Sequence, residues 1–358
     1  MSRIRSEASV SARGASTPAG GTSTRGLTEG AVQAALVTVL ALGARYVPLL
    51  AVVTTFLIPL PLAVLVIRHG IRPAVLAAVV AGLIAGVLAG PLTGFGILAT
   101  VAPLGIVLGL GARAGRSAPA LLGMLTLVSV AALLLNLALT LALADVNPYQ
   151  VMIESMRRGQ EASEAFYRRL GIPPEQLEAT SRQVRQVLAL MPRLIPVLVV
   201  LGGVMSAWIN YQVARAVLGR LGHTLPALPP ASTWRLPAYV LWLLPAGLLL
   251  TATAGPVRPP QGETAPPMPL PAVVGLNILY GVQMAFAAQG ILVAWVALRR
   301  YILLPFLRVV ILLFVVLNPV LGVVITLAGM ADSVFRLRER LDPSLARSTA
   351  AAGAEIRS

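Results

Sequence analysis

The sequence contains no cysteine and no lysine, and it has few acidic residues. The absence of cysteine excludes disulfides, thiolate catalysis and Cys-ligated metals. All 28 basic residues are arginine, against 13 Asp and Glu, and only 11% of the 358 residues are charged, whereas 57% are hydrophobic. Soluble domains carry about 25% charged residues. A chain this poor in charge, with repeated uncharged runs of about 20 residues, is predicted to be an all-α, polytopic integral membrane protein.

Acidic residues are also missing from most of the apolar sequence. None lies between residues 31 and 144, 179 and 261, or 264 and 331. Proton- and sodium-coupled transporters usually carry a membrane-embedded carboxylate, so such coupling is not expected. The two histidines, His69 and His223, form no HExxH pattern, and no GxxxxGK[ST] loop is present. We therefore predict no catalytic residue, no metal site, no cofactor and no enzymatic activity.

Eight apolar segments predict about eight transmembrane helices, at residues 27–44, 47–67, 71–90, 95–112, 118–144, 194–218, 236–254 and 272–298. A ninth stretch, 301–329, would be about 43 Å long as one straight helix, against a hydrocarbon core of roughly 30 Å. Pro305 and the Asn318-Pro319 pair are the expected break points, because proline removes a backbone donor and clashes with the preceding turn. A broken or re-entrant C-terminal segment is favoured, and a single tilted crossing is the alternative.

Arginine in the short connections predicts the orientation. With the N-terminus inside, two arginines lie in the short outer connections, Arg45 and Arg258, and nine lie in the inner ones: Arg68, Arg72, Arg113, Arg116, Arg215, Arg220, Arg235, Arg299 and Arg300. The positive-inside rule then predicts a cytoplasmic N-terminus. Arginines distributed in this way do not indicate a nucleic-acid partner; the expected surroundings are the lipid bilayer.

Composition divides the chain into five parts. Residues 1–26 are predicted to be a disordered tail, 27–144 a first membrane block of five helices, 145–190 an extramembrane helical insert, 191–335 a second membrane block, and 336–358 a basic, disordered tail. Gly171-Ile172-Pro173-Pro174 divides the insert into two amphipathic helices. Two interpretations of the insert stay open: a lid or docking element, or a hairpin lying on the lipid headgroups.

A few polar side chains inside the apolar segments are candidates for ligand binding. They can donate and accept hydrogen bonds without titrating, and their helical spacing groups some of them on one face. Hydrogen bonding between helices is the competing interpretation, since amide and hydroxyl groups commonly pair across membrane helices. The candidates are Asn136, Ser206, Asn210, Asn277, Tyr280 and Gln283.

Small residues recur at a spacing of four in the third segment, which places them in one smooth ridge along a helix. We predict that this ridge packs closely against the fourth segment, with a turn at residues 91–94; docking of a partner subunit is the alternative. The predicted packing residues are Ala74, Ala78, Gly82, Gly86, Gly90, Gly105 and Gly109.

Three short motifs resemble those of a known family. They are TEGA at residues 28–31, PLPL at 59–62 leading into VIRHG at 66–70, and GMADSVFRLR at 329–338. Together they resemble the YybS-like bacterial membrane proteins (domain of unknown function 2232), a family without an assigned function, over roughly residues 27–341. The first half is similar in style to the substrate-binding S components of energy-coupling-factor vitamin transporters, although this chain has more spans and the helical insert.

The resemblance implies a location in the bacterial cytoplasmic (inner) membrane and capture of a small molecule, with coupling supplied by a separate ATPase and transmembrane module. The leading hypothesis is therefore a transport-related, small-molecule-binding subunit that lacks its own energy-coupling residues. The alternative is a non-transporting interaction or scaffold protein that binds other proteins of the cell envelope.

Overall fold

The computed structural model describes residues 24–143, 148–171, 173–255, 268–302 and 304–342, which contain helices, turns and connections but no strand. The first half comprises α1 (Thr24–Tyr46), α2 (Pro48–Leu57), α3 (Pro59–His69), α4 (Ile71–Ala89), α5 (Pro91–Gly96), a π-helical turn (Ile97–Val101), α6 (Ala102–Arg113) and α7 (Ala118–Leu143). The second half comprises α8 (Pro148–Arg169), α9 (Pro174–Arg220), α10 (Leu243–Ala252), α11 (Leu270–Tyr301), α12 (Pro305–Leu317), α13 (Pro319–Phe335) and α14 (Leu337–Leu341).

The predicted class, an all-helical multi-pass membrane protein, is confirmed. Within the described residues, six helices are long and apolar enough to cross a membrane, and the bent α12–α13 pair makes up to seven. The segments at 47–67 and 236–254 form shorter apolar helices, Val53–His69 and Ala238–Ala252. Pro48 and Pro59 begin new helices in the first of them, and Pro237 precedes short 3₁₀ turns in the second, so neither forms one uninterrupted span.

The C-terminal apolar stretch breaks at the two predicted positions. Helix α12 begins at Pro305 and α13 begins at Pro319, and the axes of the two helices differ by 103°. The Asn318 side-chain oxygen accepts hydrogen bonds from the backbone N–H groups of Val320 and Leu321, each at 3.1 Å. The asparagine thereby caps α13, and proline at the first helical position needs no donor.

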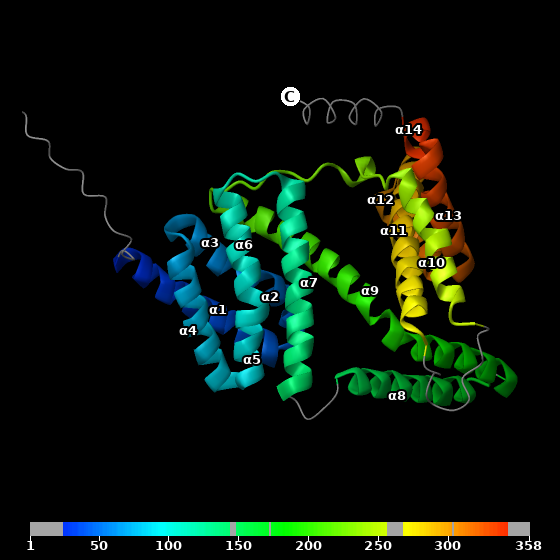
Figure 1. The fold of residues 1–358 in the computed structure, drawn as a ribbon, viewed down its shortest axis with the longest axis horizontal. Coiled ribbons are helices and arrows are strands. Elements are labelled where there is room, and N and C mark those ends of the chain that lie inside the picture. The colour runs from blue at the N-terminus through cyan, green and yellow to red at the C-terminus, as the bar shows by residue number, and fades with distance from the viewer. Residues whose placement is uncertain (1–23, 144–147, 172, 256–267, 303, 343–358) are drawn as a thin grey trace, which may run out of the picture.

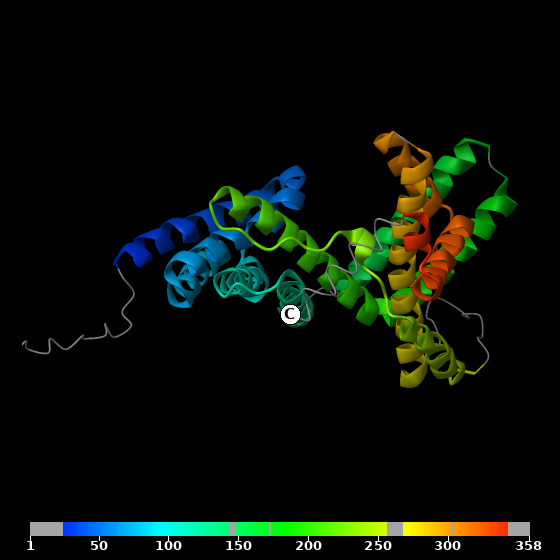
Figure 2. The ribbon, with the colours of Figure 1, turned by 90° about the horizontal axis from the view of Figure 1, so that it is seen from above.

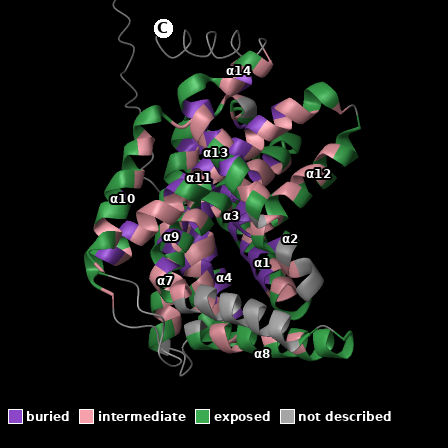
Figure 3. Cartoon of the chain, turned by 90° about the vertical axis from the view of Figure 1, so that its right-hand side faces the viewer, coloured by how far each residue is buried: buried purple, intermediate pink, exposed green. Residues whose placement is uncertain are grey.

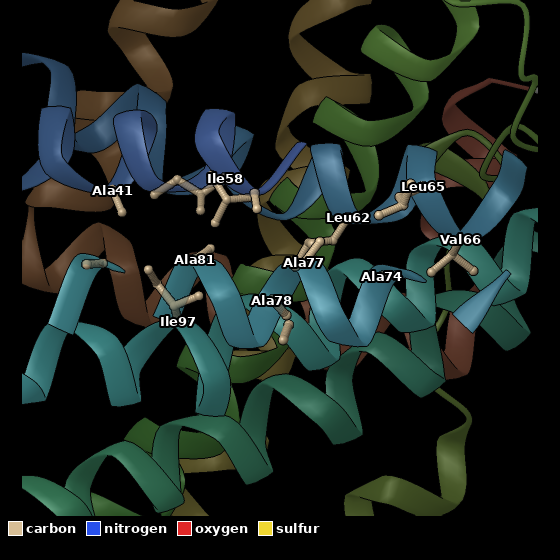
Figure 4. Packing of buried hydrophobic residues seen from close by; sticks show 14 residues of the cluster. Ala41, Ile58, Leu62, Leu65, Val66, Ala74, Ala77, Ala78, Ala81 and Ile97 are labelled. Carbon is tan, nitrogen blue, oxygen red and sulfur yellow. The ribbon is translucent and has the colours of Figure 1, made fainter. Parts of the chain in front are cut away.

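The N-terminal bundle packs largely through small side chains. Figure 4 shows Ala74, Ala77 and Ala81 of α4 facing Leu62 and other buried residues of neighbouring helices. Side chains this short allow α1, α3 and α4 to approach closely, which favours dispersion contacts in a lipid environment that offers no hydrophobic driving force between helices.

Helix α9 connects two groups of helices. Figures 1 and 2 show α1–α7 on one side, α10–α14 on the other, and α9 crossing obliquely between them. Near its C-terminal end α9 packs on the first group, where Tyr211 is fully buried and its hydroxyl donates to the Pro226 carbonyl at 2.6 Å. Near its middle α9 packs on α11 of the second group.

The arginine-rich connections gather at one end of the molecule. Figure 1 places the α6–α7 connection, the segment between α9 and α10, and α14 together at its upper end. The C-terminal arginines of the described chain therefore lie on the side of the other arginine-rich connections, as expected if the α12–α13 pair turns back. At the opposite end α8 runs at a steep angle to α7 and α11, and none of its described side chains is buried (Figures 1 and 3).

Two predicted segments differ in detail from the structure. The insert does contain two helices separated near Gly171, but the second continues without interruption into the following span as α9. Residues 1–23 and 343–358 lie outside the described residues. The start of the predicted C-terminal tail is not irregular, because Leu337–Leu341 forms α14 and the Arg338 side chain is buried.

Candidate functional site

The structure distributes the six predicted ligand-binding residues over three helices with different neighbours. Asn136 lies on α7, where its side-chain nitrogen is 3.9 Å from the position of a Cβ on Gly96. Ser206 and Asn210 lie on α9, and Asn277, Tyr280 and Gln283 lie on α11, with Gln283 exposed. The six residues therefore do not form one polar cluster, and the residues on α7, α9 and α11 have different surroundings.

Asn277 joins α11 to the backbone of α9. Its side-chain nitrogen donates to the Arg193 carbonyl at 2.7 Å, and its oxygen accepts from the Val197 N–H at 2.9 Å. These two backbone groups are four residues apart in α9. Pro196 lies between them and disturbs the hydrogen bonds of this turn, because it has no N–H and its ring clashes with the carbonyl group four residues earlier. The Asn277 amide thus satisfies both groups, which is the interhelical role weighed against ligand binding.

Asn210 differs from Asn277 because its side-chain oxygen accepts no hydrogen bond from the described residues. Its nitrogen donates to the Ser206 carbonyl at 2.8 Å and approaches the Ser206 hydroxyl at 3.3 Å. Its oxygen is buried and has no hydrogen-bond partner among the described residues, and the whole side chain is only 3% exposed. A buried amide oxygen left without a donor costs about 1–3 kcal/mol. Asn210 is therefore the predicted residue with spare hydrogen-bonding capacity.

Two more side-chain oxygen atoms, one on α7 and one on α9, are also buried and unpartnered among the described residues. They belong to Ser129 on α7 and Gln212 on α9. Helices α7 and α9 pack directly on each other: a Cβ on Gly203 would lie 3.1 Å from the Val130 backbone nitrogen, tighter than an ordinary contact. Asn210 and Gln212 are two positions apart, about 200° around the helix axis, so their side chains leave α9 on different sides. The three oxygens are therefore separate spare acceptors on two packed helices.

A second polar cluster, the C-terminal network, consists of Gln289, Asp332, Ser333 and Arg338. Asp332 and Arg338 form an ion pair at 2.8 Å, with side chains only 0% and 2% exposed. The Arg338 backbone N–H also donates to the other Asp332 oxygen at 2.9 Å. This arrangement leaves the carboxylate paired on both oxygens, as a buried charge requires.

Gln289 connects this ion pair to the rest of the second group of helices. Its nitrogen lies 3.0 Å from Asp332 Oδ2 and 3.0 Å from Ser333 Oγ, and its oxygen accepts from the Leu236 N–H at 2.8 Å. The Arg338 guanidinium also donates to the Trp234 carbonyl. The C-terminal network therefore ties α11, α13 and the connection before α10 together.

Residues flanking the C-terminal network reinforce the same junction. Among the described residues other than glycine, Arg336 has a positive φ, of 55°. This left-handed backbone conformation turns the chain from α13 into α14. Glu339 then pairs with Arg235 at 3.3 Å. Sequence reasoning did not select this junction, although Asp332 is the lone acid of its apolar stretch and Gln289 a polar residue within α11, two signals that mark buried polar contacts.

Four of the predicted packing glycines, Gly82, Gly86, Gly105 and Gly109, occupy two contacts, whereas a Cβ on Gly90 would meet nothing within 4 Å. A Cβ on Gly82 would meet Leu98 at 3.0 Å and the Gly94 carbonyl at 3.3 Å, so this part of the ridge faces the α5–α6 segment as a hairpin turning near Gly90. Gly105 and Gly109 instead face α3: a Cβ on Gly105 would lie 2.9 Å from the Leu62 Cβ, and one on Gly109 2.8 Å from the Ala63 carbonyl oxygen. Both contacts are internal to the chain.

The unpartnered oxygens of the candidate residues can bind a ligand through hydrogen bonds without carrying a charge. No group of three or more His, Cys, Asp or Glu is placed to hold a metal ion within the described ranges. Fold and polar groups together define a polytopic helical membrane protein whose interior combines paired charges with unpaired amide and hydroxyl oxygens.

Comparison with known proteins identifies the family. A family model described as "Predicted membrane protein (DUF2232)" matches residues 35–333. The chain belongs to this family, which confirms the resemblance to the YybS-like proteins; the similarity to energy-coupling-factor S components stays a prediction. It is similar to the uncharacterized protein YybS of Bacillus subtilis (strain 168), with 22% identity over 220 residues, 62% of this chain and 70% of that protein. No solved structure matches.

Proposed function

We propose that this protein is a membrane subunit that binds a small molecule at the α7–α9 contact and relies on a separate module for energy coupling. The observation that carries the proposal is the buried, unpartnered side-chain oxygen of Asn210. A ligand that donates a hydrogen bond to this oxygen would remove the cost of leaving it unpaired, which would be a direct contribution to binding.

The Asn210 side chain sets the chemical class of the ligand. Its unpartnered oxygen is an uncharged acceptor, and its nitrogen already donates to the Ser206 carbonyl. An anionic ligand would find no spare donor on this amide. The site therefore favours a neutral or cationic molecule with N–H or O–H donors, small enough to enter between two packed helices.

The need for a separate coupling module follows from the carboxylates. Within the described spans, the two acids are Glu29 and Asp332. Glu29 lies 3.6 Å from an Arg68 nitrogen and 2.9 Å from the His69 ring nitrogen, and Asp332 is buried against Arg338. A carboxylate already held by a cation is poorly suited to bind and release a coupling proton or sodium ion, which supports a role as a subunit rather than a self-sufficient transporter.

Native mass spectrometry of the protein released from its own membranes in mild detergent tests the proposal. The wild-type protein is expected to retain a defined non-lipid adduct, and Asn210→Leu is expected to lose it while keeping its fold. Asn136→Leu is the matched control, because this asparagine lies on α7 beside Gly96 rather than at a buried unpaired oxygen. Asn277→Leu is unsuitable as a probe, since it also removes contacts with the α9 backbone.

The unfolding midpoint of the same variants separates the alternatives. Without a ligand, replacing a buried, unpaired amide by leucine should raise the midpoint, since an unsatisfied polar group is removed. Wild-type protein that carries only lipids together with a co-purified envelope protein would refute the ligand-binding proposal and support the interaction or scaffold function. Co-purified ATPase subunits would support the coupling part of the proposal.

A further inference from the structure

An apolar groove runs along the outside of the N-terminal bundle, far in sequence from the α7–α9 contact. It lies between α1, from Gly26 to Ala34, and α4, from Pro73 to Val80, and has a volume of about 140 Å³. Every residue lining it is apolar or glycine. Because the groove is open on one side, it can accept a segment of a chain-like apolar molecule from the surrounding bilayer.

One end of this groove is positively charged. Arg25 directly precedes Gly26 on the first wall, and Arg72 directly precedes Pro73 on the second. A Cβ on Gly30 would lie 3.8 Å from the Pro73 carbonyl oxygen, so the second turn of α1 lies beside the first turn of α4. Both arginines are exposed, and both sit in the first turn of a helix, where the helix dipole also favours an anion.

The nearby carboxylate does not cancel this charge. Glu29 lies one turn beyond Arg25, but its side-chain oxygen is already held by His69 at 2.9 Å and by Arg68 at 3.6 Å. The charge of Arg25 also acts on Glu29, so this one carboxylate is shared among Arg25, Arg68 and His69. The head of the groove is left with a net positive charge beside an apolar channel.

We propose that this groove binds an anionic glycerophospholipid, with one acyl chain against α1 and α4 and the phosphate between Arg25 and Arg72. Arginine suits this role because its guanidinium can donate two parallel hydrogen bonds to one phosphate. The arrangement selects a lipid over a free anion because the apolar walls continue directly from the charged head. It selects an anionic over a zwitterionic lipid because the acid that the structure describes near the head, Glu29, is already shared among His69, Arg68 and Arg25 and does not pair with a choline or ethanolamine group.

The test uses the full-length protein in mild detergent, titrated with phosphatidylglycerol or with phosphatidylcholine of identical acyl chains and read by native mass spectrometry. Phosphatidylglycerol is expected to bind more tightly. Arg25→Gln and Arg72→Gln should each weaken it about fivefold, the usual contribution of one basic residue to binding an anionic lipid. Arg45→Gln, at the other end of α1, is the matched control and should change nothing.

Blocking the groove tests the acyl-chain contact. Ala31→Phe introduces a large ring at an exposed residue that lines the groove, whereas Ala35→Phe places the same ring on an exposed part of α1 outside it. Only the first should reduce phosphatidylglycerol binding, with no change in the unfolding midpoint of either variant. Equal binding of the two lipids, binding that millimolar inorganic phosphate abolishes, or equal effects of the two phenylalanine variants would each overturn the proposal.

Discussion

The closest helix contact in the described chain, between α11 and α13, gives the sharpest test of the fold. Gly290 and Gly329 face each other there. A Cβ on Gly290 would lie 2.7 Å from the Ile325 carbonyl carbon, and one on Gly329 would lie 2.7 Å from the Gly290 nitrogen. Both obstacles are backbone atoms, so a rotamer change cannot relieve the clash. Gly290→Ala and Gly329→Ala must therefore push the two helices apart.

The cost can be worked out from the contacts that such a shift would disturb. Overpacking a well-packed contact costs about 1–3 kcal/mol. A shift also stretches the bonds from the Gln289 nitrogen to the Gly329 carbonyl, now 3.1 Å, and to Asp332, now 3.0 Å. Each weakened hydrogen bond adds about 0.5–1.5 kcal/mol. We expect each alanine variant to lose about 2–6 kcal/mol of unfolding free energy.

Gly322 provides a control within α13 itself. A Cβ there would meet nothing within 4 Å. Gly322→Ala should stabilise the protein by up to about 1 kcal/mol, since alanine is the better helix former. The assay is unfolding in graded mixtures of mild and denaturing detergent, followed by tryptophan fluorescence. If Gly290→Ala and Gly322→Ala shift the midpoint in the same direction, the close α11–α13 contact is wrong.

Three further predictions test the polar contacts. Asp332→Asn should cost about 3–5 kcal/mol in the same assay, because it leaves the Arg338 charge buried without its partner; an unchanged midpoint would contradict the buried ion pair. Asn277→Leu should speed hydrogen exchange at the Val197 amide by at least about fivefold, since one lost hydrogen bond is worth about 1 kcal/mol, and exchange at α7 should stay constant. Hydrogen bonds from Arg157 and Arg158 lower the pKa of Glu154 on α8, so its contribution to α8 stability is present above the ordinary glutamate pKa and disappears as the pH falls through the lowered one. Glu154→Gln should accordingly reduce protection of α8 at neutral pH only, and a difference from wild type that persists in strong acid would refute this assignment.

Local features of the sequence predicted much of the architecture. Hydropathy alone identified the class of protein, because a bilayer-spanning helix must be apolar along its length. Pro305 and Pro319 predicted the helix breaks correctly, since proline acts on its own turn of backbone whatever surrounds it. The number of full spans was less predictable, because apolar stretches such as 236–254 contain further prolines that shorten the helix.

Pairing between distant polar residues could not be predicted in this way. Asn277 was selected as a candidate ligand residue, but whether its amide faces a cavity or another helix depends on how α11 is rotated against α9. The structure uses it to bond Arg193 and Val197, which lie 84 and 80 residues away. Asn210 has the same side chain in a similarly apolar helix, yet its oxygen stays unpaired. The sequence does not distinguish the two.

The sequence by itself determined that this chain crosses the membrane several times, where its helices break, and to which family it is similar, because these properties depend on composition and local backbone chemistry. Only the tertiary structure decided which charges and amides meet. Asp332 is buried safely because α14 turns Arg338 back onto it and because Gln289 reaches it from α11. Such contacts require particular helix faces to be brought together, and one-dimensional periodicity does not specify which face of one helix meets which face of another.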